Sequence, residues 1–177
     1  MKLTYCLVLV GITLINCNEY IYTIDSNKEN RRNNQVKQIN RIYIISDVKN
    51  ENAYVRALTD ALINELSSEG IESNAVFISL PESTKKFRVP IEDIERYGAD
   101  YVFIIDPRKG TYIEKYLSKI EIDCSLYDHN ADKTIWKATI EIGSKTDLAD
   151  IEYYFALKGA AKTITNKMIE DGILKAK

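Results

Sequence analysis

The spacing of apolar residues changes along the chain, and each spacing predicts a type of secondary structure. Residues 51–69 place apolar side chains at helical intervals and predict a helix, which Gly70 ends. Pro90 opens a shorter helix over residues 91–97. Three short apolar runs predict strands at residues 41–46, 74–80 and 101–106. Because a long helix separates the first two strands, we expect a right-handed crossover in which these strands are parallel.

Strict alternation of apolar and polar residues begins in the second half of the chain. Residues 118–127 and 134–142 each place apolar side chains on one face and polar side chains on the other. A short polar connection joins them, so we expect an antiparallel hairpin in which Trp136 points inward. Residues 112–117 are a candidate extension of the first of these strands, with a bulge. Helical spacing returns over residues 148–173 and predicts a long closing helix.

These elements predict one α/β domain over residues 41–177, in the order β-α-β-α-β-β-β-α. It has a single mixed sheet, an antiparallel C-terminal hairpin and a long C-terminal helix. The preceding segment, residues 17–40, holds six asparagines and a charged centre. This composition predicts a flexible tether, in which only residues 20–22 and Ile24 could pack, as an edge strand.

Residues 1–16 predict an export signal. Lys2 is a short positive region, and residues 6–15 form a nearly unbroken apolar run. This run is too short to span a bilayer core of about 30 Å. It ends just before Cys17, as in the bacterial lipoprotein signal, which it resembles. The resemblance implies export, a lipid on Cys17 and a mature protein tethered to a bacterial membrane, at its periplasmic face or at the cell surface.

The residues around the predicted cleavage point match that signal in part. Leu14 and Ile15 fit the pattern, whereas Asn16 stands where a very small residue is preferred. A diacylglycerol with an amide-linked chain on Cys17 would anchor the protein stably, because one acyl chain alone binds only marginally. An ordinary cleaved signal and an uncleaved apolar anchor are the alternatives.

Charge argues against two classes of partner. The chain has 24 basic and 26 acidic residues and a net charge of −2, with no basic block. Nucleic acid binding and a polybasic membrane-surface role both require clustered positive charge. We therefore expect neither.

The three cysteines have three different predicted fates. Cys6 leaves with the signal, Cys17 carries the lipid and Cys124 remains alone, so no internal disulfide is expected. Cys124 lies among alternating apolar residues and is interpreted as a small buried hydrophobe. A nucleophilic cysteine would need a histidine and an electropositive setting.

Several polar groups are candidate sites. Asp128, Asn130 and Asp132 alternate like the start of a calcium loop, but no glycine and no twelfth-position glutamate follow, so a hairpin turn is favoured. His129, the single histidine, lies in this turn, which disfavours a metal cluster or a triad. Residues 83–88 could bind an anion but are better explained as solvated surface. We expect no metal and no cofactor.

The end of the third strand is the remaining candidate. Asp106 lies there beside Arg108 and Lys109, at the edge where open α/β sheets bind ligands. Ser46 and Ser79 close the other two strands. Together they define an alternative function, the binding of a small ligand, although a solvated strand end is favoured because no glycine-rich phosphate loop is present.

The hairpin over residues 125–138, with Asp128 before the turn and Trp136 after it, resembles a pattern in envelope lipoprotein domains. The similar families are those related to the TolB amino-terminal domain and the penicillin-binding-protein activator lipoproteins. The opening strand, the helix over residues 51–69 and the closing helix also follow in the same order as in these families. The segment Gly98-Ala99-Asp100-Tyr101, which leads into the third strand, has its place in that order too. The lipopolysaccharide-assembly lipoproteins are a weaker resemblance. These similarities imply a non-catalytic accessory module that docks onto another envelope protein. A ligand-binding domain is the alternative, and an enzyme the third possibility.

Overall fold

The computed structural model describes residues 20–28, 38–48, 53–78, 91–108, 111–113, 116–144 and 150–175. Seven strands and three helices occur in these ranges. They are β1 (Tyr20–Lys28), β2 (Arg41–Asp47), α1 (Ala53–Ser68), β3 (Glu72–Ile78), α2 (Ile91–Tyr97), β4 (Tyr101–Pro107), β5 (Thr111–Ile113), β6 (Tyr116–Asp128), β7 (Lys133–Ser144) and α3 (Asp150–Glu170).

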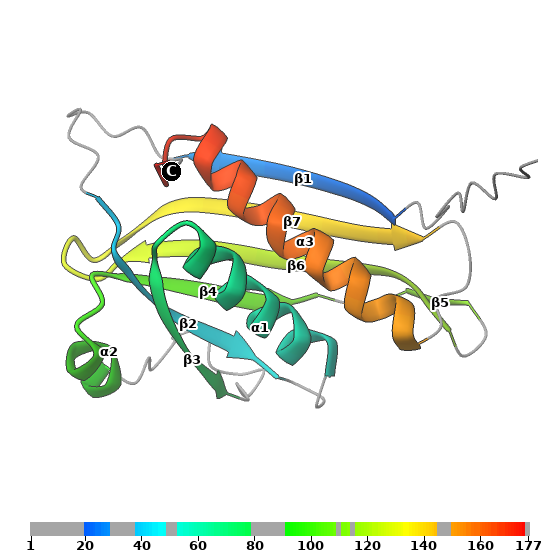
Figure 1. The fold of residues 1–177 in the computed structure, drawn as a ribbon, viewed down its shortest axis with the longest axis horizontal. Coiled ribbons are helices and arrows are strands. Elements are labelled where there is room, and N and C mark those ends of the chain that lie inside the picture. Colours follow the sequence, from blue (N-terminus) through cyan, green and yellow to red (C-terminus); the bar gives the residue numbers. More distant parts are fainter. Residues whose placement is uncertain are drawn as a thin grey trace, which may run out of the picture.

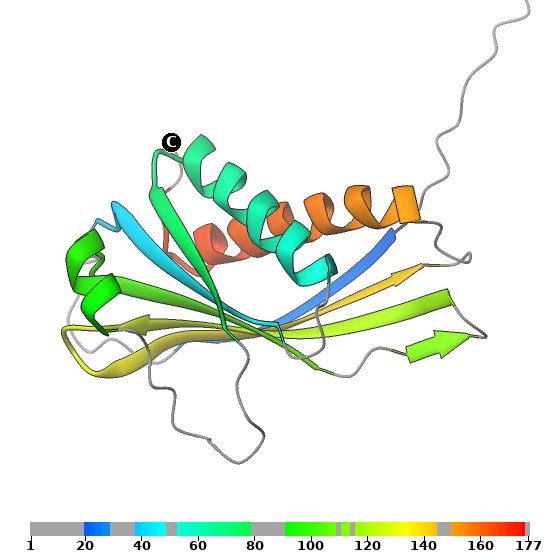
Figure 2. The ribbon, with the colours of Figure 1, turned by 90° about the horizontal axis from the view of Figure 1, so that it is seen from below.

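The strands form one mixed sheet in the order β1-β7-β6-β4-β2-β3, and β5 pairs with β6. Strand β2 pairs in parallel with both β3 and β4, whereas the pairs β4-β6, β6-β7 and β7-β1 are antiparallel. Helices α1 and α3 lie side by side across one face of the sheet (Figures 1 and 2). The predicted α/β class, the crossover β2-α1-β3 and the hairpin β6-β7 are confirmed. Two further strands, β1 and β5, were not in the predicted order.

The main core fills the space between the sheet and the two long helices. Alternate residues of β6 and β7 face it and are buried: Ile120, Ile122, Cys124, Leu126, Trp136, Ala138, Ile140 and Ile142. The inward-facing side of α1 contributes Val55, Leu58, Leu62 and Leu66. The predicted burial of Trp136 and Cys124 is therefore confirmed. The ring centroid of Trp136 lies 6.2 Å from that of Phe103 on β4.

A smaller apolar cluster covers part of the opposite face. Ile94 of α2 and Ala99 pack there against Tyr43, Ile45 and Val102. Strands β2 and β4 are consequently buried on both faces, which explains why their sequences lack strict alternation. Within the described residues, no helix is long and apolar enough to cross a membrane.

The segment predicted to be a tether is in part a strand of the sheet. β1 runs antiparallel to β7, from Tyr20 opposite Ser144 to Lys28 opposite Trp136. The edge strand that the sequence allowed at residues 20–22 and Ile24 is therefore present and continues to Lys28, and Tyr22 and Ile24 pack against the main core. Residues 17–19 and 29–37 lie outside the described residues. The first described strand of the sheet begins twenty-one residues before β2.

The predicted extension over residues 112–117 is divided between two strands. Tyr116 and Leu117 begin β6, whereas Tyr112 and Ile113 belong to β5, which pairs back onto them. The register shifts between Thr111 and Tyr112, where a bulge was expected within one continuous strand. The chain has therefore turned back at this point.

β1 approaches α3 closely at a glycine. The Tyr22 hydroxyl donates a hydrogen bond of 2.9 Å to the carbonyl oxygen of Ala156. A Cβ atom at Gly159 would lie 2.2 Å from that hydroxyl oxygen and 2.6 Å from the ring carbon that carries it. The absence of a side chain at Gly159 is what allows the Tyr22 ring to lie across the helix.

We expect Gly159→Ala to lower the free energy of unfolding by about 1–2 kcal/mol, because the displaced ring costs more than the gain in helix propensity. Urea unfolding of the single and double variants measures this. Gly143→Ala is the matched control, since a Cβ there would meet nothing within 4 Å. Tyr22→Ala combined with Gly159→Ala should cost less than the sum of the two single changes. Additive costs would show that the two positions do not interact.

Candidate functional site

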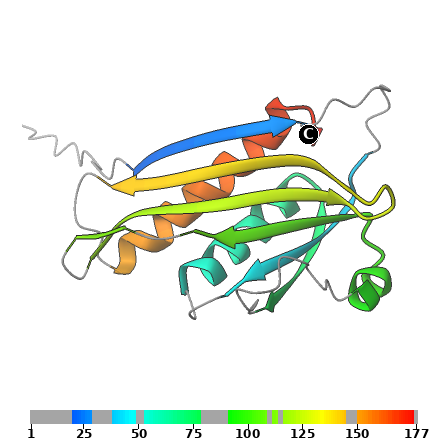
Figure 3. The ribbon, with the colours of Figure 1, turned by 180° about the vertical axis from the view of Figure 1, so that it is seen from behind.

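The face of the sheet opposite α1 and α3 carries a polar trough of about 410 Å³. Strands β1, β7, β6 and β4 lie next to one another on this side (Figure 3). Strand register aligns two rows of side chains across them. One row is Asn27, Lys137, Ser125 and Ile104, and the next is Asp25, Thr139, Asp123 and Asp106. Arg108 closes one end of this open-face trough.

Ionic contacts within and beside the trough compensate much of its negative charge. Asp123 forms an ion pair with Arg108 and accepts a 2.7 Å hydrogen bond from the Thr139 hydroxyl. The hydrogen bond with Asp123 raises the pKa of Arg108. Farther along the strands, the Lys119 ammonium lies 2.7 Å from Glu141 and 3.1 Å from Glu121, and its pKa is raised by its hydrogen bonds with Glu141 and Glu121. This arrangement suits the binding of a small polar molecule by groups that are already oriented.

The predicted strand-end site is only partly assembled. Asp106 lies in the trough, half-buried. Ser46 is opposite Ile105 in the register, so it points to the other face, where its hydroxyl lies 2.7 Å from that of Thr59 on α1. Thr59 in turn donates to the Val55 carbonyl oxygen at 2.7 Å. Ser46 therefore belongs to the packing of α1, and the residues that join Asp106 come from β1, β6 and β7 instead.

Three sequence candidates lie outside the described residues: Ser79, Lys109 and the loop 83–88. Cys17 does as well.

Cys124 lies under the floor of the trough with its side chain in the core. Burial, with a smaller contribution from Asp123, raises the pKa of the Cys124 thiol well above its ordinary value. The thiol stays protonated at neutral pH, and a protonated thiol is a poor nucleophile.

The connection between β6 and β7 is a hydrogen-bonded turn. Oδ1 of Asp128 accepts from the backbone N–H groups of Asn130 (3.1 Å) and Ala131 (3.0 Å). The His129 N–H donates to the Asp100 carbonyl oxygen at 3.0 Å, and Asp132 has φ of 51°. The turn expected from the sequence is thus present. Across the described ranges, no group of three or more His, Cys, Asp or Glu side chains could hold a metal ion.

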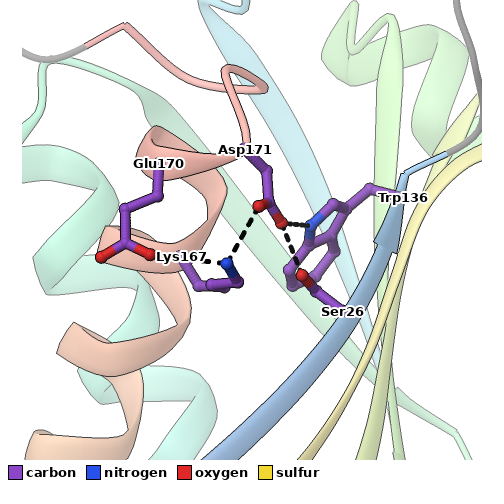
Figure 4. Close-up of polar contacts among 5 residues, drawn as sticks. All are labelled: Ser26, Trp136, Lys167, Glu170 and Asp171. Carbon is purple, nitrogen blue, oxygen red and sulfur yellow. Dashed lines mark hydrogen bonds and ion pairs between the residues drawn. The ribbon is translucent and has the colours of Figure 1, made fainter.

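A second polar cluster, which sequence reasoning missed, joins β1, β7 and the end of α3. Oδ2 of Asp171 accepts hydrogen bonds from the Trp136 indole N–H (2.8 Å) and the Ser26 hydroxyl (2.7 Å). The Lys167 ammonium lies 3.1 Å from Oδ1 of Asp171 and 3.5 Å from Glu170 (Figure 4). We call Ser26, Trp136, Lys167 and Asp171 the Asp171 junction.

The end of α3 positions this carboxylate. Gly172 has φ of 65°, and its N–H donates to the Ile169 carbonyl oxygen at 2.8 Å. The Ile173 N–H donates to the Met168 carbonyl oxygen, also at 2.8 Å. These two bonds form a Schellman motif in which Asp171 is the C-cap residue. A negative side chain is unfavourable at a helix C-terminus, so the three donors at the junction are what stabilise it there.

The three donors also set the pKa of Asp171. Burial raises this pKa, but the hydrogen bonds from Trp136, Ser26 and Lys167 outweigh burial and hold it below its ordinary value. A depressed carboxyl pKa gives stability that is present above the pKa of the unfolded chain, about 4. That stability is lost as the pH falls through the lower pKa of the folded state.

We expect Asp171→Asn to destabilise the domain by about 1–3 kcal/mol at pH 7, because charge-assisted hydrogen bonds become neutral ones. The difference from wild type should shrink as the pH falls below 4. Urea unfolding at pH 7, 5 and 3.5 measures this, with Asp60→Asn, on the exposed face of α1, as the control. A difference that is independent of pH would contradict the assignment.

Comparison with known proteins bears on the fold. No family model and no curated protein matches the chain. A PelC dodecamer from Paraburkholderia phytofirmans matches with a TM-score of 0.54 and 14% identity, over 89% of this chain and 99% of that one. A variant PelC dodecamer from the same organism gives 0.51 and 13%, over 83% and 96%. A DUF330 protein from Xanthomonas campestris gives 0.44 and 11%, over 75% and 82%. The chain is therefore similar in fold to a PelC subunit.

Proposed function

We propose that this chain is a membrane-anchored lipoprotein of the bacterial envelope whose domain is a non-catalytic accessory module that binds another envelope protein. The observation that carries the proposal is the position of β1 directly behind the predicted lipidation site. Only two residues separate Cys17 from Tyr20, the first residue of β1. An extended chain of this length covers about 10 Å, so a lipid on Cys17 would hold the sheet at the membrane surface.

The contacts of β1 support a direct mechanical connection between anchor and domain. Nine residues of β1 pair with β7. Tyr22 bonds to Ala156 within the first half of α3, and Ser26 bonds to Asp171 at its C-terminal end. The segment behind the anchor is thus part of the fold. A domain held this closely presents its other surfaces to proteins of the same membrane.

The chemistry of the polar groups supports binding in preference to catalysis. The side chain of Asp123 is engaged by Arg108 and Thr139, and the buried Cys124 thiol is protonated. The two PelC structures named above are described as dodecamers, so a second copy of this chain is one of the partners that the experiment below distinguishes. The relationship to the TolB amino-terminal and penicillin-binding-protein activator families stays a prediction.

Cross-linking in intact cells, followed by affinity purification, tests the proposal. We expect wild type to carry lipid on Cys17 by mass spectrometry, to fractionate with membranes and to capture one defined envelope protein or further copies of itself. Cys17→Ala should lose the lipid and the capture. Cys124→Ala removes a different thiol and should retain both.

Two results would overturn different parts of the proposal. Wild type without lipid on Cys17 would remove the anchor. Lipidated protein that captures no defined partner would remove the accessory role and favour ligand binding.

The open-face trough supports that second function, the binding of a small polar ligand beside Asp106. Its groups come from four strands, and the side chains of Asp25, Asn27 and Lys137 are exposed along it. A volume of about 410 Å³ is within the range of small-molecule sites.

If this function is correct, one class of small polar molecules at about 100-fold its Kd should stabilise the domain by about 2.7 kcal/mol. For a domain of this size the melting temperature would rise by about 5–10 °C. Ser125→Trp fills the middle of the trough and should abolish the shift. Thr23→Trp, on the same face of β1 but outside the trough, should retain it. Equal shifts in both variants would place the ligand elsewhere.

A further inference from the structure

The polar side chains of the open-face trough fall into two groups, those already bonded within the protein and those that are not. Asp123 belongs to the first group, because Arg108 and Thr139 both engage it. Four other side chains that line the trough form no hydrogen bond or ion pair with any residue that the structure describes: Asp25, Asn27, Ser125 and Lys137. These four groups are the ones that a ligand would meet unsatisfied.

The four unbonded groups lie in two neighbouring rows across strands that Figure 3 shows side by side. Asn27, Lys137 and Ser125 are directly opposite one another on β1, β7 and β6. Their amide, ammonium and hydroxyl groups can all donate hydrogen bonds. Asp25 lies in the next row and carries a carboxylate, which only accepts. Two residues of strand separate the rows, a distance of about 7 Å.

Lys137 differs from the other cations of this face in its lack of an acidic partner. The Lys119 ammonium, farther along the strands, lies 2.7 Å from Glu141 and 3.1 Å from Glu121. Asp25 lies diagonally across from Lys137, yet among the described residues neither forms an ion pair. Both side chains are exposed. The trough therefore presents one positive and one negative group that are close together but not joined.

Opposite charges at this separation are complementary to a zwitterion of matching length. A single amino acid is too short, because its ammonium and carboxylate are attached to the same carbon. An extended dipeptide spans about 7 Å. Its carboxylate would accept hydrogen bonds from Lys137, Asn27 and Ser125, and its ammonium would donate to Asp25.

We propose that the open-face trough binds a zwitterion of the length of a dipeptide, with the carboxylate at Lys137 and the ammonium at Asp25. This inference rests on the ligand-binding function proposed for the trough, and it adds the charge pattern and the orientation of the ligand. The carboxylate end points toward the β6-β7 turn, since Lys137 is nearer to that turn than the row of Asp25 is.

Isothermal titration calorimetry with L-alanyl-L-alanine tests this on the full-length protein as purified from cells. Three comparison compounds each lack one feature: the N-acetyl derivative has no ammonium, the C-terminal amide has no carboxylate, and alanine is a shorter zwitterion. We expect the dipeptide to bind at least about fivefold more tightly than each of them, because each loses a charged contact.

Two variants should remove the two preferences separately. In Lys137→Met the dipeptide and its amide should bind with nearly equal affinity, while the N-acetyl derivative stays weaker than the dipeptide. In Asp25→Asn the dipeptide and its N-acetyl derivative should become nearly equal, while the amide stays weaker. Lys158→Met and Asp60→Asn, at exposed positions of the helices that cover the other face, are the matched controls and should keep the wild-type order.

The failure of this inference is distinguishable from the failure of ligand binding itself. Equal affinity of wild type for the dipeptide and its two derivatives overturns the inference alone. The same holds if the dipeptide does not bind while another class of small polar molecule does, with its binding abolished by Ser125→Trp. If no small polar molecule binds in the trough, the inference falls together with the proposed ligand-binding function.

Discussion

A buried indole N–H needs an acceptor, and meeting this need organises the fold around Trp136. This side chain is fully buried and is the largest in the core. An unpaired N–H at such a depth would cost about 1–3 kcal/mol. The carboxylate of Asp171 accepts it, and the same oxygen accepts from Ser26. One acceptor atom therefore fixes the end of α3, the inner face of β7 and the position of β1 relative to one another.

The two halves of the sheet are covered in different ways, and this difference determines what each can do. β2 and β4 have apolar side chains on both faces, against α1 on one side and α2 on the other. β1, β6 and β7 bury only the face beneath α1 and α3, which leaves their other face for charged and polar residues. The open-face trough is thus a consequence of the antiparallel half having one helical layer. Its rigidity comes from the apolar packing on the reverse side.

The sequence predicted the elements whose patterns are local. α1 has apolar residues at every turn, and the hairpin β6-β7 alternates over its whole length with a turn that Asp128 stabilises. β1 was predicted only as an edge strand within a tether, because the asparagine-rich residues around it dominate the composition of that segment. In addition, its pairing partner β7 is distant in the sequence: Tyr20 lies opposite Ser144, more than a hundred residues away. Asp171 was missed for a similar reason: two of its three donors, Ser26 and Trp136, come from the distant strands β1 and β7. Ser46 and Asp106 were expected together, but the register of two parallel strands, which composition does not encode, sends them to opposite faces.

The place of β1 at the edge of the sheet also decides how the domain would respond to force. A pull between the membrane and a bound partner would enter the fold at Tyr20 and act along the axis of β1. The backbone hydrogen bonds between antiparallel strands are perpendicular to that axis. All the bonds along the nine paired residues of β1 and β7 would then be sheared together instead of opening one after another. If the domain is anchored at Cys17 as proposed, this shear geometry would let it keep its fold under a load that would open strands bonded one pair at a time.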